Sequence, residues 1–439
     1  MPNVYIETLG CARNQVDSEV MAAALGRAGW RLCDEPGDAE AIVVNTCSFI
    51  ESATDESIDT ILALAAYKTR GRCRRLIVSG CLPERYREET AKALPEVDQF
   101  LGTGAYDQVV AAVSGTVAQG ACLLPDPDRI DIQTPVRRRP FARHAAYLKI
   151  AEGCSRHCTF CIIPKLRGRQ KSRLPEAVIA EARALTADGV REITLVAQET
   201  TAYGRDLAGR TTLAGLMGRL ADVGDNVWYR FLYGHPQTMT TELVRTIAQN
   251  PKLCPYFDVP IQHASETVLQ SMGRRYRADD LKRLFTDIRE IAPEAALRTT
   301  VLVGFPGERD SDFQQLADLV RQVEFDHLGV FAYSDAEDLA SHTLGNHVEP
   351  QVARERLDAL MQIQREISER RLMRYDEQPL TVLVEKQAEP GIYTARSMFQ
   401  APEVDGCVLI KTDQVLEAGL FLPVRIVETL EYDLIAEPV

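Results

Sequence analysis

The chain has 439 residues, and its 50 Lys and Arg residues against 63 Asp and Glu residues give a formal net charge of −13. Hydrophobic residues make up 45% and charged residues 26%, which is typical of a globular chain with domains of about 150 residues and excludes disorder, collagen-like repeats and disulfide-stapled miniproteins. No apolar run approaches the roughly 18 residues of a membrane span, and the first residues lack the basic and apolar regions of a signal peptide. We therefore expect a cytoplasmic protein that does not bind membranes.

The first domain, residues 1–122, alternates β-prone and helical segments, which predicts a parallel sheet built from βα units. The expected strands are residues 4–8, 41–46 and 75–79, and the expected helices are residues 17–28, residues 52–69 and a segment that begins at Pro83. Residues 123–143 are rich in Pro, Asp and Arg without periodicity and are predicted to form a linker.

The second domain, residues 144–371, repeats the pattern at longer intervals. Its six β-prone runs, each followed by a helical segment, are residues 146–151, 192–197, 227–233, 256–261, 298–303 and 327–333. Six βα units are fewer than the eight of a closed barrel, so we expect an open, partial barrel. An amphipathic, Arg-rich helix over residues 350–375 is expected to lead onward.

The third domain, residues 372–439, has short strands separated by Gly, Pro and Asp, at residues 380–384, 407–410 and 422–427. This pattern predicts a small all-β barrel or sandwich. From residue 376 to residue 439 there are twelve acidic and four basic residues, so more than half of the net negative charge lies here. The expected fold class is thus a multidomain α/β protein with a small all-β module.

Three of the eleven cysteines, Cys154, Cys158 and Cys161, lie within eight residues after the first barrel strand. Cytosolic thiols stay reduced, so disulfides are not expected. Three thiolates on one loop at the mouth of a barrel can bind three irons of an iron–sulfur cube and leave the fourth iron open. The alternative is a zinc site completed by His157, although its place between two of the thiols suits a tetrahedron poorly.

A second group is predicted by topology. Cys11, Cys47 and Cys81 each follow a predicted strand of the first domain, and the carboxyl ends of parallel strands meet at one edge of a sheet. Gly10 and Gly80 would let the backbone approach closely. We expect a second metal site here, with three unrelated core cysteines as the alternative. The other cysteines are interpreted as structural: Cys33, Cys73, Cys122, Cys254 and Cys407.

The Cys-x-x-x-Cys-x-x-Cys spacing, with Phe160 before the last cysteine, resembles the radical S-adenosylmethionine signature. With the N-terminal cysteines and the small β domain, the chain is similar to the methylthiotransferases over nearly its whole length. The resemblance implies two 4Fe–4S clusters, one on each cysteine group, with the catalytic one on Cys154, Cys158 and Cys161. It also implies S-adenosylmethionine as cofactor and an OB-like TRAM domain at the C-terminus.

The family has one branch that modifies an adenosine in tRNA and another that modifies an aspartate of ribosomal protein S12. Residues 147–154, 198–204 and 258–265 resemble the ribosomal-protein branch; the tRNA branch more often has Pro-Val-Gln-Ser-Gly where residues 260–264 read Pro-Ile-Gln-His-Ala. Glu199 departs from this pattern, where Asp is expected. The resemblance implies hydrogen removal from the aspartate β-carbon, sulfur delivery from the auxiliary cluster, a flavodoxin or ferredoxin as electron donor, and a monomer.

The acidic third domain agrees with a basic protein substrate and not with strong nucleic-acid binding, because RNA-binding surfaces are basic. Glu403 and Asp405 are candidates for steering such a substrate, although acidity also serves solubility. The rival functions are the tRNA-modifying activity and a non-catalytic, zinc-binding scaffold for a basic partner.

Softer candidates for cofactor contacts lie at barrel-strand ends or carry guanidinium groups that bind carboxylates. They are Phe160, Gln198, Thr200, Tyr203, Arg230, His263, Arg298 and Gly304. Each has an ordinary alternative. His263 could be a core histidine, Gly304 could serve a tight turn, and Arg230 and Arg298 could form internal ion pairs.

Overall fold

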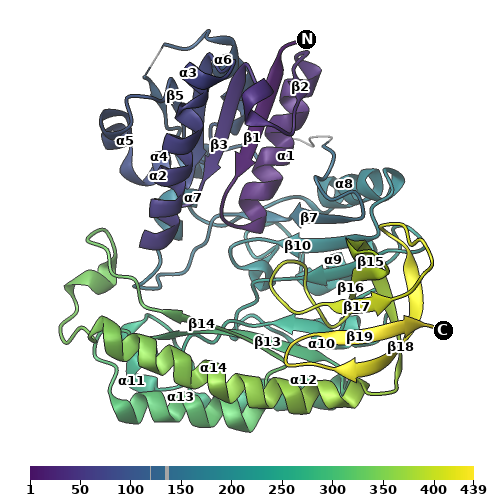
Figure 1. The fold of residues 1–439 in the computed structure, drawn as a ribbon. Coiled ribbons are helices and arrows are strands. Elements are labelled where there is room, and N and C mark those ends of the chain that lie inside the picture. The colour runs from purple at the N-terminus through teal and green to yellow at the C-terminus, as the bar shows by residue number, and fades with distance from the viewer. Residues whose placement is uncertain (119, 134–137) are drawn as a thin grey trace.

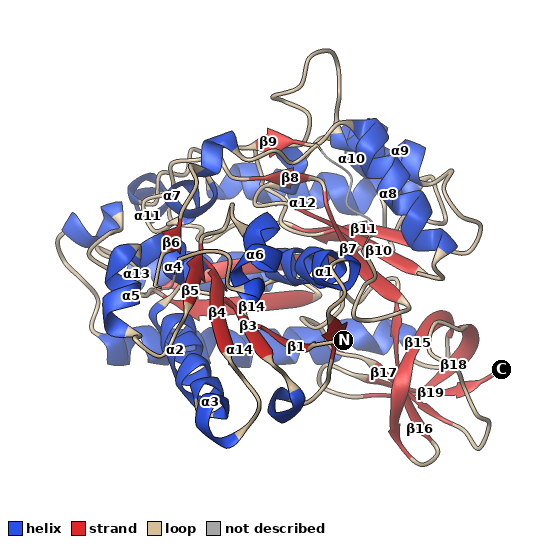
Figure 2. Ribbon diagram, turned by 90° about the horizontal axis from the view of Figure 1, so that it is seen from above, coloured by secondary structure: helices blue, strands red, loops and turns tan. Residues whose placement is uncertain are grey.

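A computed structural model describes residues 1–118, 120–133 and 138–439. The N-terminal domain stands over the central barrel, and the C-terminal domain lies against one side of that barrel (Figure 1). The view from above shows the N-terminal strands crossing the middle of the molecule, with the C-terminal strands apart from them (Figure 2). Residues 134–137 of the predicted linker lie outside the described residues.

The N-terminal domain is a six-stranded parallel sheet in the order β2-β1-β3-β4-β5-β6. Its strands are β1 (Asn3–Thr8), β2 (Arg31–Leu32), β3 (Ala41–Thr46), β4 (Arg75–Gly80), β5 (Gln99–Leu101) and β6 (Cys122–Leu123). Its helices are α1 (Ala12–Arg27), α2 (Glu51–Ala65), α3 (Tyr67–Arg70), α4 (Cys81–Tyr86), α5 (Glu88–Ala93) and α6 (Val109–Ser114), with 3-10 turns η1 (Pro36–Asp38), η2 (Tyr106–Gln108) and η3 (Pro127–Arg129). The three predicted strands are confirmed, and β3 is buried along its whole length, as an inner parallel strand requires.

The central domain has two three-stranded parallel sheets, β11-β10-β7 and β12-β13-β14. The strands are β7 (Ala145–Lys149), β10 (Glu192–Val196), β11 (Trp228–Phe231), β12 (Tyr256–Asp258), β13 (Ala296–Val303) and β14 (His327–Ala332), beside a short pair β8 (Ala151–Glu152) and β9 (Lys171–Ser172). The helices are α7 (Ile163–Arg167), α8 (Pro175–Ala187), α9 (Leu213–Leu220), α10 (Thr241–Ala248), α11 (Glu266–Ser271), α12 (Ala278–Ile291), α13 (Asp310–Val323) and α14 (Pro350–Leu372), with turns η4 (Thr200–Ala202), η5 (Ala340–Thr343) and η6 (Met373–Tyr375).

The two central sheets are joined where the amide of Cys254 donates to the carbonyl of Tyr229, with an N to O distance of 2.8 Å. The predicted open, partial barrel is therefore confirmed. Its apolar core lies between the strands and the helices that surround them. The predicted connecting helix corresponds to α14, which ends at Leu372 and continues as the turn η6.

The C-terminal domain is a closed five-stranded barrel in the order β15-β16-β17-β19-β18. Its strands are β15 (Pro379–Glu389), β16 (Ile392–Ser397), β17 (Val408–Lys411), β18 (Phe421–Thr429) and β19 (Leu434–Pro438). This confirms a barrel and not a sandwich, and it adds two strands that were not predicted. Among the described residues, no helix is both long and apolar enough to cross a membrane.

Candidate active site

The first cysteine group lies at one edge of the N-terminal sheet. Cys11, Cys47 and Cys81 follow β1, β3 and β4, which are neighbours in the sheet. Gly10 has a φ of 92°, and a Cβ at this position would lie only 2.7 Å from the Cβ of Cys47. Burial raises the pKa of Cys81 to about 11, and the neighbouring thiols of Cys47 and Cys11 raise it as well. The structure therefore brings these three thiols together, as the topology predicts.

The second group lies on the loop between β8 and α7. The amide of Cys154 donates to the carbonyl of Gly168 (3.0 Å), and the amide of Cys161 donates to that of Cys158 (3.1 Å). The pKa of Cys154 is raised to about 11 and that of Cys161 to about 12, chiefly by burial and in smaller part by the neighbouring thiols of the loop. Backbone hydrogen bonds thus fix the part of the loop that carries the three cysteines.

The donor chemistry of both groups fits an iron–sulfur cluster. Over the described ranges, no three His, Cys, Asp or Glu side chains are close enough to hold one metal ion. In a four-iron cluster, each of three thiolates would bind a separate iron. His157, the fourth ligand in the zinc alternative, is exposed and lines a surface cavity beside Arg274 and Arg275.

A buried arginine joins the two groups. Arg167 ends α7, the helix after the second group, and its Nη2 lies 3.9 Å from the Sγ of Cys81. The same guanidinium donates to Oδ1 of Asn14 at 2.7 Å and pairs with Oδ2 of Asp17 at 2.8 Å, so it reaches α1. Because α1 begins directly after Cys11, this contact fixes both cysteine groups relative to each other.

A second cation completes a buried network at this point. Lys149, the last residue of β7, pairs with Glu152 at 2.7 Å and also with Asp17. Glu152 lies near Arg167 and accepts from the amide of Gln198. Desolvation would raise the pKa of Glu152, but Lys149 and Arg167 hold it well below the usual carboxyl range. Two cations thus balance two anions, as burial of charge requires. The motif spacing did not predict this network. The signal in the sequence is that Lys149 and Glu152 lie around the end of a predicted strand, just before Cys154.

Three residues that follow β10 and are predicted to contact a cofactor make hydrogen bonds within the protein. They are Gln198, Thr200 and Tyr203. Gln198 meets Glu152 in the network described above, and Thr200 accepts from the amide of Ala197 at 3.1 Å. The hydroxyl of Tyr203 donates to the carbonyl of Arg173 at 2.7 Å within the apolar core.

Glu199, which departs from the family pattern, binds the loop of the second cysteine group. Its two carboxylate oxygens accept from Arg156 at 2.8 and 2.6 Å. Glu199 therefore anchors that loop.

Phe160 and His263 lie near the loop after β13. The ring of Phe160 meets that of Phe305 edge-on, with 6.4 Å between centroids. His263 is fully buried, and its Nδ1 accepts from the amide of Ser265 at 2.9 Å. Its Nε2 and Oε1 of Glu308 are 3.8 Å apart, and neither has a hydrogen-bond partner among the described residues. Oε1 of Glu308 also lies 3.4 Å from Nη1 of Arg356, so the pair belongs to a buried internal ionic cluster.

Gly304 has a φ of 75°, and a Cβ there would lie 2.4 Å from the Cβ of Ala353. Its missing side chain therefore accommodates the close approach of α14. Its positive φ is that of the tight turn in the alternative interpretation, and the packing of α14 is a further role that was not predicted.

Arg230 and Arg298 form the internal ion pairs of the alternative interpretation. Arg230 pairs with Glu192 at 2.5 Å, and Glu192 also pairs with Arg396 of the C-terminal domain at 2.5 Å. Arg298 pairs with Asp258 at 3.1 Å and with Asp405 at 3.4 Å. Both arginines therefore attach the C-terminal domain to the barrel.

Asp405 also corrects the steering expectation. Its side chain is 1% exposed, and it accepts from the hydroxyl of Tyr256 at 2.6 Å. Glu403 bonds to the hydroxyl of Tyr147 at 3.1 Å. Asp405 is a buried interface residue, so it offers no charge to a substrate in solution.

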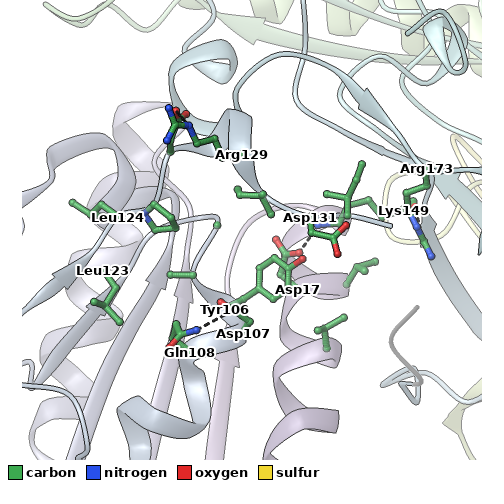
Figure 3. Close-up of a pocket in the computed structure, with 18 of the residues that line it drawn as sticks. Asp17, Tyr106, Asp107, Gln108, Leu123, Leu124, Arg129, Asp131, Lys149 and Arg173 are labelled. Carbon is green, nitrogen blue, oxygen red and sulfur yellow. Dashed lines mark hydrogen bonds and ion pairs between the residues drawn. The ribbon is translucent and has the colours of Figure 1, made fainter. Parts of the chain in front are cut away.

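A cavity of about 840 Å³ lies between α1, η2 and the segment that follows β6 (Figure 3). Asp17, Tyr106 and Lys149 face it from the two domains, and Asp131 faces it from the linker. None of the six cysteines is among its described lining residues. The cavity therefore reaches the buried ionic network, but the cysteine groups are not part of its described lining.

Comparison with known proteins agrees with this architecture. Residues 3–102 match the uncharacterized protein family UPF0004, residues 148–320 match the radical SAM superfamily and residues 378–439 match the TRAM domain. The fold and the cysteine loop thus define a radical SAM protein with an N-terminal UPF0004 domain and a C-terminal TRAM domain.

Relatives over the full length identify the family. The chain is 53% identical to the ribosomal protein uS12 methylthiotransferase RimO of Desulfosudis oleivorans, with 99% of each chain covered. It is 42% identical to that of Clostridioides difficile (100% and 99% covered) and 43% to that of Geobacter sulfurreducens (99% and 98%). The chain belongs to the RimO family of methylthiotransferases.

Solved structures show the same fold at low sequence identity. The radical S-adenosylmethionine methyltransferase TsrM from Kitasatospora setae, with cobalamin and a 4Fe–4S cluster bound, superposes with a TM-score of 0.57 at 16% identity. The match covers 76% of this chain and 75% of that one. At this identity the likeness concerns the fold alone.

Proposed function

We propose that this protein adds a methylthio group to the β-carbon of an aspartate in ribosomal protein uS12. The observation that carries the proposal is the full-length similarity to proteins named ribosomal protein uS12 methylthiotransferase RimO. The two groups of three thiols, joined through Arg167, agree with it. A ribosomal substrate would place the reaction in the cytoplasm.

Each cysteine group would hold one 4Fe–4S cluster. Cys154, Cys158 and Cys161 would hold the cluster that binds S-adenosylmethionine, and the cysteines of the N-terminal sheet edge would hold the auxiliary cluster. Once reduced by a donor of the flavodoxin or ferredoxin class, the first cluster would supply the electron that cleaves S-adenosylmethionine, which would give a radical able to take hydrogen from an unactivated carbon; the auxiliary cluster would supply sulfur. The protein supplies position and exclusion of water.

The chain's own residues supply that position. Arg167 and Lys149 hold α1 against the start of the barrel loop, so the two thiol groups keep a fixed separation. Arg156, paired with Glu199, fixes the loop from its other side. Rigid support matters because misplacement by about 1 Å can cost a hundredfold in rate.

The charge of the C-terminal domain favours a basic protein over tRNA as the substrate. Although Asp405 is buried, other acidic residues of this domain are exposed, among them Glu389, Asp413 and Glu417. An anionic surface attracts a basic ribosomal protein and repels phosphates. A surface that binds RNA would instead be basic.

Anaerobic assay of the reconstituted protein tests the proposal. Purified uS12 would be incubated with reductant and S-adenosylmethionine, and its peptides would be read by mass spectrometry. We expect a methylthio group on one aspartate, and none when Cys158→Ala replaces the wild-type enzyme. An unmodified aspartate with an enzyme that still cleaves S-adenosylmethionine would contradict the proposal.

A further inference from the structure

Arg13 spans the gap between the N-terminal domain and the barrel mouth. It lies in the first turn of α1, two residues after Cys11, and its Nη1 donates to the carbonyl of Ala197 at 3.0 Å. Its guanidinium carbon lies 4.7 Å from the ring centroid of Tyr233. Ala197 and Tyr233 follow the carboxyl ends of β10 and β11, where barrel enzymes place their substrates.

Arg13 differs from the neighbouring cations because no carboxylate is paired with it directly; its main charge interactions are with the Cys11 thiol and the Tyr233 hydroxyl. Arg167, Lys149 and Arg156 each pair with a carboxylate. Across the part of the chain that the structure describes, no carboxylate lies within 4.0 Å of Arg13, and its side chain is only half-buried. Arg274 also has no ion pair within those residues, but it lies over Phe160 in the other cysteine loop.

The ring of Tyr233, on which Arg13 stacks, is held in place. Tyr233 has a φ of 64°, a backbone conformation that costs energy for a residue with a side chain. Its amide donates to Oδ2 of Asp258 at 2.7 Å, and Asp258 is itself paired with Arg298. Stacking on this ring and bonding to Ala197 leave the guanidinium little freedom to lose when it binds an anion.

We infer that Arg13 binds the side-chain carboxylate of the target residue and makes the site specific for an acidic side chain. This inference rests on the proposed function. A guanidinium binds a carboxylate through parallel N–H donors and discriminates against a neutral amide. In aspartate the carboxylate is bonded directly to the β-carbon, so fixing the carboxylate also fixes the carbon that reacts.

A double-mutant cycle on binding tests this inference separately from the chemistry. The partners are wild-type enzyme or Arg13→Gln, and uS12 carrying its target aspartate or asparagine at that position. We expect Arg13→Gln to weaken binding of the aspartate protein about tenfold or more, since hydrogen bonds to charged groups contribute at that level. Binding of the asparagine protein should be unchanged by the substitution.

Three controls make the result specific. Arg13→Lys keeps the charge and should restore part of the affinity, and Arg219→Gln on the surface of α9 should bind like wild type. Iron content and cleavage of S-adenosylmethionine without uS12 should match wild type in Arg13→Gln. Equal weakening for both uS12 proteins, or loss of cofactor cleavage, would overturn the role of Arg13. Binding by wild type without any methylthio product would instead overturn the proposed function.

Discussion

Nη2 of Arg167 lies 3.9 Å from Sγ of Cys81, although the two residues are 86 positions apart in the chain. Arg167 belongs to the helix that follows the barrel cysteines, and Cys81 begins the helix that follows β4. One guanidinium therefore connects the two thiol groups across the domain boundary. Its other contacts, to Asn14 and Asp17, make the connection rigid.

Replacing Arg167 should destabilise this boundary. Arg167→Leu leaves Asp17 and Glu152 buried with one cation fewer, and breaking a buried ionic group costs about 3–5 kcal/mol. The measurement is the free energy of unfolding from denaturant titration. Arg219→Leu removes an exposed ion pair with Glu176 and should change stability by no more than about 0.5 kcal/mol. Equal stability of both variants would contradict the role of Arg167.

Removing the N-terminal thiols should halve the bound iron. The triple variant of Cys11, Cys47 and Cys81 to alanine should keep the barrel cluster and still cleave S-adenosylmethionine, but form no methylthio product. The triple variant of Cys154, Cys158 and Cys161 should lose cleavage. Iron and acid-labile sulfide analysis checks both, and unchanged iron in the first variant would show that the N-terminal thiols hold no cluster.

Much of the fold follows from the sequence because buried parallel strands are continuous apolar runs. The start of α1 could not be predicted in this way, because the helix begins at Ala12 and not at residue 17. Its first turn is polar, but Ala12 and Val16 pack against barrel residues such as Tyr147, a contact visible only in three dimensions. Strands β16 and β19 were missed for a related reason, since barrel closure pairs these short segments.

Glu192 should make docking of the C-terminal domain sensitive to acid. Burial alone would raise its pKa, but Arg396 and Arg230 lower it from about 4.5 to about 2. The lowered pKa contributes stability that is fully present above about pH 4.5 and is lost as pH falls toward 2; the shift corresponds to about 3 kcal/mol. Glu192→Gln should therefore unfold at lower temperature than wild type at pH 7, and this difference in Tm should narrow below pH 4.5. A difference in Tm between the two proteins that does not change with pH would contradict the stabilising role of ionised Glu192.

Exposed acidic residues, and not Asp405, should attract the substrate. Reversing Glu389 and Asp413 to lysine should weaken uS12 binding at low salt and much less at high salt, because exposed charges are screened. Thermal stability should be unchanged. Asp405→Asn should instead lower the stability, since its carboxylate bonds to Tyr256 and Arg298 inside the interface. If the double reversal leaves binding unaltered at every salt concentration, steering by this domain is wrong.

In the site, the positions of the cysteines could be predicted from the sequence, but the roles of two arginines could not. The position of Cys11, Cys47 and Cys81 follows from strand order, because each lies one or a few residues beyond a strand end. The roles of Arg230 and Arg298 could not be read the same way. A guanidinium near a strand suits a ligand or an internal acid equally well, and the choice depends on Glu192 and Asp258 and on how the C-terminal domain docks.

The most direct test of the central claim offers uS12 and unmodified tRNA side by side to the reconstituted enzyme, with both products read by mass spectrometry. We predict a methylthio group on an aspartate of uS12 and no modified adenosine. A methylthio group on the tRNA alone would keep the chemistry but contradict the substrate, and with it the inferred roles of Arg13 and the acidic C-terminal surface.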